Sequence, residues 1–198
     1  MVHRDERWKE SGNYDSLLVL THFKGHTMGG FGGSNKNIGI GCADGRIGKG
    51  MIHTVEGSDN LWSIAEEELM ERITESTKSV VDHFGENIVF INVLRNMSVS
   101  CDCEGVGAAP VVTPNIGIVA STDILAADQA SVDLVYALKD SDHKDLVERI
   151  ETRHGLRQLS YMKEMHMGND RYHLINIDED DKEILPADAV KNVKPFQG

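Results

Sequence analysis

The 198-residue chain has 20 basic and 32 acidic residues, a formal net charge of −12, and a hydrophobic content of 40% that is ordinary for a soluble globular protein with one core. The acidic balance argues against nucleic acid as a partner, because phosphate binding needs a broad basic surface. No apolar run is long enough to span a bilayer and the start, MVHRDERWKE, is not a signal peptide, so we expect a cytoplasmic protein without membrane contact.

The first predicted element is a buried strand over residues 17–23, which follows an N-terminal extension over residues 1–14. The next stretch, 21–53, holds ten glycines, three histidines, four basic residues and one cysteine, against a single acid, Asp44. Glycines let backbone N–H groups approach a ligand, and the cations attract negative charge. We expect an anion or cofactor cradle here, with a flexible surface loop as the alternative. The predicted contacts of the cradle are Lys24, Gly29, Gly30, Gly32, Gly33 and Asn35.

Apolar residues at helical spacing then predict a helix that is capped by Ser58 or Asp59 and ends at Gly85. The β-branched run at 88–93 is typical of a strand covered on both faces. Further predicted elements are a loop at 95–114, a strand at 116–120, a helix from 121–123 to 138, helices at 144–154 and 156–167, and a strand at 172–177. This alternation predicts an α/β fold with a mostly parallel sheet flanked by helices, in a single domain over residues 15–178, followed by an acidic tail at 179–198.

Ligands of parallel sheets bind outside the carboxyl ends of the strands. The Gly-rich stretch, the Cys101-Asp102-Cys103 loop and the turn at 121–123 each follow a predicted strand, so we expect them to form one site. Asp123 and Asp128, at the start of a helix, are most simply a cap and a first-turn acid. Asp128 alternatively orients a group in a loop.

Cysteine and histidine residues in these loops predict a metal site. Cys42, Cys101 and Cys103, with His53, offer ligands that suit zinc or an iron–sulfur cluster. A disulfide between Cys101 and Cys103 would need a strained ring, so a shared ligand is the better interpretation. The alternative for Cys42 is a small buried residue.

Two other side chains of the Gly-rich stretch are candidates for catalysis. His26 is a candidate general acid–base group near neutral pH, as is His22, and each is alternatively a hydrogen-bonded structural residue. Lys36 and Lys24 are candidate anion contacts, or covalent attachment points if desolvated, and are alternatively solvated surface lysines.

Three segments together carry a resemblance to a known family: SLLVLTHFKGHTMGGFGGSNKNIGIGCADGRIGK, INVLRNMSVSCDCEGVGAAPVV and NIGIVASTDILAADQASVDLVYA. They resemble the domain-of-unknown-function 362 family, whose members are often described as iron–sulfur or ferredoxin-like proteins. The resemblance covers most of residues 15–177. The ferredoxin insert of many members, with its Cys-x-x-Cys-x-x-Cys runs, is replaced here by a plain helix within 57–84. The N-terminal portion that is usual in the family is also missing from this sequence. We therefore expect either a fragment or a chain that needs a partner subunit to complete its sheet.

A more distant similarity links His26, Lys36 and His53 to nickel-pincer lactate racemases. That similarity implies an acid–base role for His26, a nucleotide attachment point at Lys36 and a nickel ligand at His53, with nickel ranking below iron–sulfur and zinc.

Three functional hypotheses result. The first is a metal- or iron–sulfur-binding protein with a redox or enzymatic role. The second is an isomerase-like enzyme that binds a small-molecule anion or cofactor with His26 and Lys36. The third is a non-catalytic subunit of a homo-oligomer.

Overall fold

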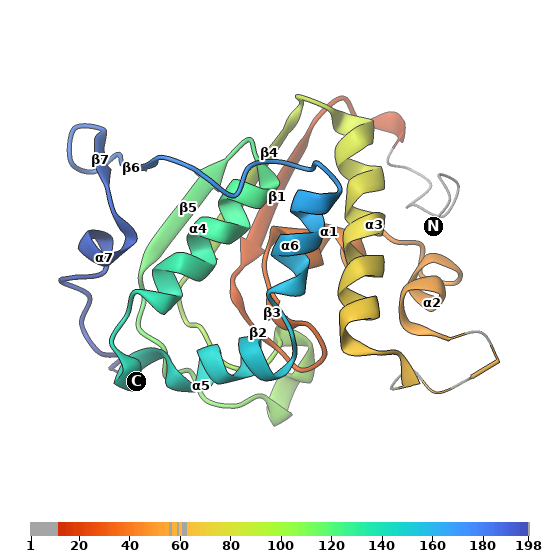
Figure 1. The fold of residues 1–198 in the computed structure, drawn as a ribbon, viewed down its shortest axis with the longest axis horizontal. Helices are drawn as coiled ribbons and strands as arrows, with labels where there is room; N and C mark the ends of the chain where they lie inside the picture. The colour runs from red at the N-terminus through yellow and green to blue at the C-terminus, as the bar shows by residue number, and fades with distance from the viewer. Residues whose placement is uncertain (1–11, 56, 59, 61–62, 198) are drawn as a thin grey trace.

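A computed structural model describes residues 12–55, 57–58, 60 and 63–197. At its centre is a three-stranded sheet in the order β1-β4-β5, formed by β1 (Leu17–His22), β4 (Ile88–Leu94) and β5 (Gly117–Ser121). Side chains alternate along each strand, which sends Val19, Phe90 and Val119 into the core. Helices cover this face, with α4 (Ile124–Tyr136) lying over β4 and β5 in Figure 1.

The α/β class is confirmed, but the sheet is not mostly parallel. β1 and β4 are parallel, whereas β5 runs antiparallel to β4 and pairs Ser121 with Phe90. A parallel neighbour needs a crossover that returns the chain to the starting edge of the sheet. Between β1 and β4, helices make that crossover. After β4, residues 95–116 contain only a short 3-10 helix, η4 (Asp102–Gly107), so β5 begins at the end of the sheet where β4 finishes.

The direction of β5 also separates the three segments that were expected to form one site. The Gly-rich stretch and the Cys-x-Cys loop follow the carboxyl ends of two parallel strands and lie at the same end of the sheet. The turn at 121–123 lies at the opposite end, and the prediction of one site from all three segments is therefore wrong. Asp123 caps α4 by accepting the N–H of Ala126 at 2.9 Å, as one reading of its position predicts.

The Gly-rich stretch is mostly regular structure rather than an open loop. It forms a hairpin of β2 (Lys24–His26) and β3 (Gly30–Gly32), then α1 (Ser34–Gly41) and α2 (Gly48–His53). A Cβ on Gly39 would lie 2.6 Å from the Ile73 carbonyl oxygen, so the glycine lets α1 pack closely on α3 (Glu66–Phe84). Several glycines here therefore serve contacts between elements of the protein.

A buried carboxylate fixes the start of α1. Asp128 of α4 accepts the backbone N–H groups of Ser34 at 2.7 Å and Asn35 at 2.9 Å, and the side-chain amide of Asn92 at 2.8 Å. Burial raises the pKa of Asp128, while these three donors favour its charged form. Because a Cβ on Gly33 would lie 2.6 Å from the carboxylate, only glycine fits there. The alternative prediction for Asp128, that it orients a group in a loop, agrees with these contacts at the start of α1.

The remaining elements surround this core. α3 begins at Glu66 with Ala65 as its N-cap, later than expected, and ends at Gly85, which has a φ of 55°. Asp59, one of the predicted caps, and residues 1–11 of the predicted extension lie outside the described residues. The elements that complete the chain are α5 (Asp140–Thr152), α6 (Arg157–Glu164), β6 (Leu174–Asn176), β7 (Lys182–Ile184) and α7 (Pro186–Ala189).

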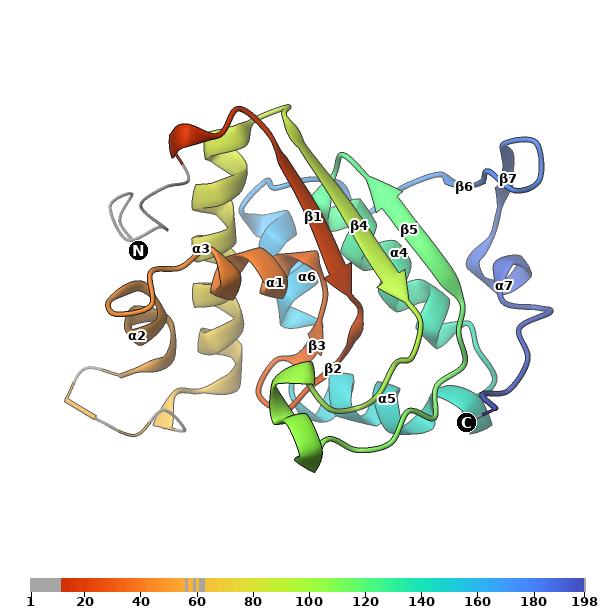
Figure 2. The same cartoon turned by 180° about the vertical axis from the view of Figure 1, so that it is seen from behind.

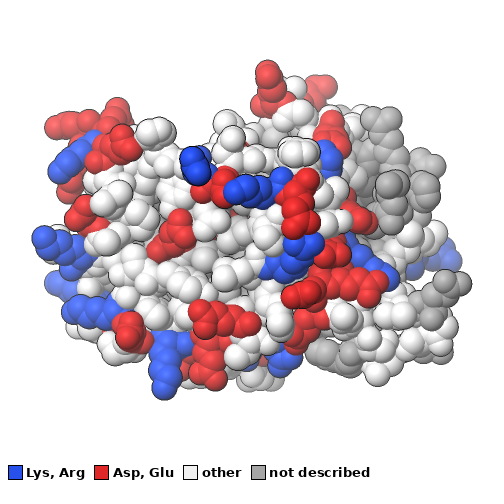
Figure 3. Space-filling model, viewed as in Figure 1, with Lys and Arg blue, Asp and Glu red and all other residues white. Residues whose placement is uncertain are grey.

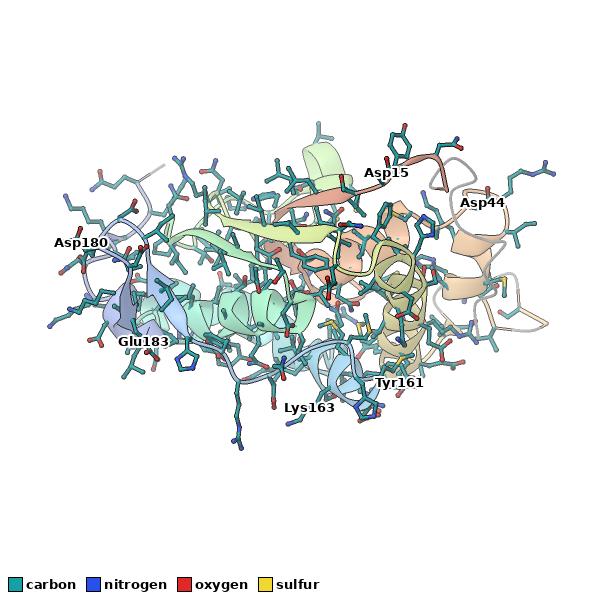
Figure 4. All side chains as sticks on the ribbon, turned by 90° about the horizontal axis from the view of Figure 1, so that it is seen from above. Asp15, Asp44, Tyr161, Lys163, Asp180 and Glu183 are labelled. Carbon is teal, nitrogen blue, oxygen red and sulfur yellow. The ribbon has the colours of Figure 1, made fainter. Side chains whose placement is uncertain are left out.

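The segment predicted to be an acidic tail contains β7 and α7, and Val190 next to α7 is buried in the main core. Figure 4 shows Asp180 and Glu183 at the β6–β7 end of the molecule and Asp44 at the opposite end, near α2. No helix in the described part of the chain is long and apolar enough to cross a membrane.

No helix of the described residues lies over one face of the central sheet (Figure 2). Leu18 and Leu20 of β1 are 62% and 64% exposed on this face, Val89 of β4 is 38% exposed and Ile118 of β5 is 65% exposed. The expectation that the 88–93 strand is covered on both faces is therefore wrong for this chain by itself. The opposite, helix-covered side of the molecule is charged rather than apolar: acidic and basic side chains are interspersed over it in Figure 3.

We expect Asp128→Asn to lower the free energy of unfolding by about 2–4 kcal/mol, because an amide would place a donor against backbone N–H groups in a buried site. Urea denaturation at pH 7 measures this change. The matched control is Asp140→Asn, on an exposed first-turn acid of α5, which should change stability by about 0.5 kcal/mol or less. Equal urea midpoints for the two variants would contradict the role assigned to Asp128.

Candidate metal centre

Three metal-ligating side chains meet beyond the carboxyl ends of β1 and β4. His26 ends β2, and Cys101 and Cys103 lie at the start of η4. One ligand atom from each of the three lies within 4.8 Å of the others. The Cys103 thiol donates to the Cys101 sulfur at 2.7 Å, so the two sulfurs face the same point. This hydrogen bond, together with burial, raises the pKa of Cys103.

The acids that alternate with the cysteines dock the Cys-x-Cys loop on the Gly-rich segment. Asp102 accepts from His22 Nδ1 at 3.0 Å and forms an ion pair with Lys24 at 3.1 Å. Burial opposes ionisation of Asp102, but the hydrogen bonds from His22 and Lys24 outweigh it and lower its pKa. These contacts hold one side of η4 against the β1–β2 segment.

Glu104 makes the second docking contact. It accepts the hydroxyl of Thr27 at 2.6 Å and the backbone N–H of Cys101 at 2.9 Å, and both bonds lower its pKa. The alternating order Cys-Asp-Cys-Glu thus directs sulfurs toward His26 and carboxylates toward neighbouring groups of the Gly-rich segment.

Gly25 lets the two backbones meet. Its N–H donates to the Ser98 carbonyl oxygen at 2.7 Å, and a Cβ at this position would lie 2.3 Å from the Val99 carbonyl oxygen. That oxygen also accepts from Arg149 of α5 at 3.0 Å, which limits its freedom to move. Any side chain at residue 25 would therefore push the Cys-x-Cys loop away from His26.

His26 is held in its neutral form. Burial lowers its pKa to about 3, with further lowering by the positive charges of Lys36 and Lys24. Its Nδ1 accepts the backbone N–H groups of Gly29 at 2.9 Å and Met28 at 3.3 Å. In this hydrogen-bond arrangement the ring proton is on Nε2.

The donor set fits a borderline or soft divalent metal, because it consists of two thiols and a neutral imidazole. One adjustment is required. Ligation through Nε2 of His26 moves the ring proton to Nδ1, where it would face the N–H groups of Met28 and Gly29. Ligation through Nε2 would therefore require residues 27–29 to rearrange, whereas ligation through Nδ1 would replace the hydrogen bonds from Met28 and Gly29.

Two residues of the predicted ligand set are not part of this group among the described residues. Cys42 packs against the main core at the end of α1, and burial raises its pKa. His53 ends α2, where its Nδ1 lies 2.8 Å from the Lys49 carbonyl oxygen, yet it is near enough for its charge to lower the pKa of His26. His26, predicted as an acid–base group, occupies the third ligand position.

The predicted cradle residues divide into two sets. Gly29, Gly30 and Asn35 are buried: the Gly29 carbonyl accepts from Gln158 at 2.9 Å, and the Asn35 amide donates to Thr74 at 3.0 Å. Internal contacts therefore occupy the Gly29 carbonyl and the amide nitrogen of Asn35. Lys24, Gly32 and Gly33, by contrast, line a cavity of about 170 Å³, together with Lys36, which was predicted as a catalytic residue.

Asp102 and Glu104 are residues of the candidate site that the sequence pattern did not predict. A signal for them was present, since a loop with two acids and two cysteines is complementary to the cationic Gly-rich stretch of an acidic chain. What the sequence did not reveal was that the acids would be used to dock the loop.

We expect Gly25→Ala to lower the free energy of unfolding by about 2 kcal/mol or more and to weaken metal binding, because the new Cβ overlaps a fixed carbonyl group. Urea denaturation and a zinc titration measure the two effects. The control is Gly50→Ala in α2, where a Cβ has no atom within 4 Å and should be neutral or stabilising. An unchanged stability of Gly25→Ala would contradict the close approach described here.

No curated protein and no solved structure matches the chain. Residues 8–133, more than half of the chain, match a family model described as "Domain of unknown function (DUF362)". The match includes the central strands, the Gly-rich segment and all three ligands of the candidate centre. The chain therefore belongs to the DUF362 family.

Proposed function

We propose that this protein binds one divalent metal ion through His26, Cys101 and Cys103 and uses it to polarise a small bound molecule. The observation that carries the proposal is the convergence of these three ligand atoms within 4.8 Å, from segments far apart in the sequence. Three protein ligands leave a fourth tetrahedral position open, as in catalytic zinc sites. When bound there, the metal would supply Lewis-acid chemistry.

Within this proposal, a mononuclear zinc-type centre is favoured over an iron–sulfur cluster. Clusters are usually held by four thiolates. The group found among the described residues supplies two thiols and one imidazole. A redox role therefore ranks second, and the identity of the bound metal decides between the two. Reduced thiols of this kind suit a reducing compartment such as the cytoplasm.

We expect the purified protein to bind about one zinc ion per chain, and His26→Gln, Cys101→Ser and Cys103→Ser each to lose most of this binding. Elemental analysis after equilibration with zinc and removal of excess metal measures the stoichiometry. Cys42→Ser and His53→Gln are matched controls that should keep full occupancy. Bound iron with sulfide would favour the cluster, whereas equal occupancy in all five variants would contradict the centre.

The tautomer of His26 provides a second readout of the same experiment. Because ligation through either ring nitrogen of His26 would break the hydrogen bonds from the N–H groups of Met28 and Gly29, their amide NMR signals should shift on zinc binding. Binding should also release protons from the thiols, so that affinity falls as the pH is lowered. Zinc that binds without either change would be bound elsewhere.

An isomerase-like enzyme is the main catalytic alternative, because the charge of Lys36 acts on His26. In that mechanism His26 moves a proton, and a ring whose pKa is lowered to about 3 is a weak base for this task at neutral pH. A histidine that binds a metal, by contrast, must be in its neutral form, which His26 already is. The metal centre is therefore the better use of this residue.

The open sheet face supports an additional role in assembly. The exposed side chains of Leu18, Leu20 and Ile118 form an uncharged apolar surface in an acidic protein, and such surfaces commonly mark interfaces. We propose that a second copy of the chain covers this face.

We expect the protein to be a dimer at micromolar concentration, and Leu20→Glu to make it monomeric, because the new charge would be buried in the interface. Sedimentation equilibrium measures the mass. The control is Leu185→Glu, which alters a leucine of similar exposure next to α7 and should leave the dimer intact. A wild-type protein that remains monomeric at high concentration would contradict assembly through this face.

A further inference from the structure

The cavity beside the candidate metal centre has a cationic wall. Lys24, Gly32, Gly33 and Lys36 line this space of about 170 Å³. A Cβ on Gly32 would lie 3.6 Å from Lys24 Cε and 4.0 Å from Lys36 Cδ, so both lysine side chains pass over the same glycine. Two ammonium groups from different elements thus reach one small space.

The cavity adjoins the centre. Lys24 is two residues from His26 and forms an ion pair with Asp102, which lies between the two cysteines. The charge of Lys36 acts on both His26 and Cys103. A molecule held by the lysines would therefore lie next to the three metal ligands.

The balance of charges around the cavity indicates the charge of the ligand that it would bind. The charge of Lys24 is balanced by Asp102 at 3.1 Å, whereas Lys36 has no carboxylate within ion-pair distance in the described part of the chain. A divalent metal with two thiolates and a neutral His26 adds no net charge, and neither do two protonated thiols without metal. The cavity therefore keeps one uncompensated positive charge, that of Lys36.

Size is compatible with a small ligand. The cavity of about 170 Å³ is large enough for several water-sized groups. This volume suits the carboxylate end of a short organic acid. A compact dianion such as phosphate would fit by volume but would leave one negative charge uncompensated.

We propose that this cavity binds the carboxylate of a small organic acid between Lys24 and Lys36, next to the His26–Cys101–Cys103 centre. The carboxylate site stands on the cavity and its cations alone. The proposed function is needed for one further step only, namely that the metal acts on the molecule bound at this site.

Acetate titration followed by amide NMR tests the proposal, with sodium acetate as the probe at constant ionic strength. The amide signals of Gly32 and Gly33 should shift saturably, in zinc-loaded and in metal-free protein. Lys36→Gln should weaken acetate binding about tenfold or more, because it removes the uncompensated charge. The matched control is Lys49→Gln, on an exposed lysine of α2 outside the cavity, which should leave the affinity unchanged.

Several outcomes would overturn the carboxylate site. These are the absence of saturable shifts at Gly32 and Gly33, equal affinities of wild type and Lys36→Gln, or tighter binding of inorganic phosphate than of acetate. If acetate binds as expected but zinc does not load, the metal centre fails and the carboxylate site stands. If zinc loads but acetate does not bind, the inference fails and the metal centre stands.

Discussion

The carboxylate of Asp128 is the constraint on which the rest of the structure depends. It connects α4, the central strand β4 through Asn92, and the start of α1 through two backbone N–H groups. A helix start is a natural anion site, and here an internal carboxylate occupies it. The Gly-rich segment is therefore anchored from inside, and its cations Lys24, which is paired with Asp102, and Lys36 line a cavity instead.

Anchoring at α1 also positions the candidate centre. Residues 24–32 lie between β1 and the fixed start of α1, so the hairpin that carries His26 is held at both ends. The Cys-x-Cys loop then docks on this hairpin through Asp102 and Glu104, across the close approach at Gly25. Charge complementarity between an acidic loop and a cationic segment brings the sulfurs to the imidazole. In this way a ligand set is assembled from two loops that contact each other directly.

In our proposals, the same loops make the metal centre and the anion site neighbours. Asp102 neutralises Lys24 while docking the cysteines, which leaves Lys36 as the uncompensated cation next to them. A metal ion and a carboxylate would then be bound side by side, with the metal polarising what the lysines hold. The open face of the sheet differs from these charged loops, because its exposed side chains are apolar. In our proposal this face serves assembly.

The local sequence pattern determined the elements whose apolar residues follow a regular spacing. These are the strands at 17–22 and 88–94 and the helix at 124–136, together with the helix end marked by Gly85. It did not reveal α1 and α2, because a glycine-rich segment has low intrinsic helix propensity, and packing against α3 at Gly39 overrides it. The direction of β5 depends on how a loop returns the chain, which no local pattern encodes. For the site, the sequence identified the Cys-x-Cys pair and the cationic stretch. Only the tertiary structure grouped His26 rather than Cys42 or His53 with the pair, because ligand proximity is set by the docking of two distant loops.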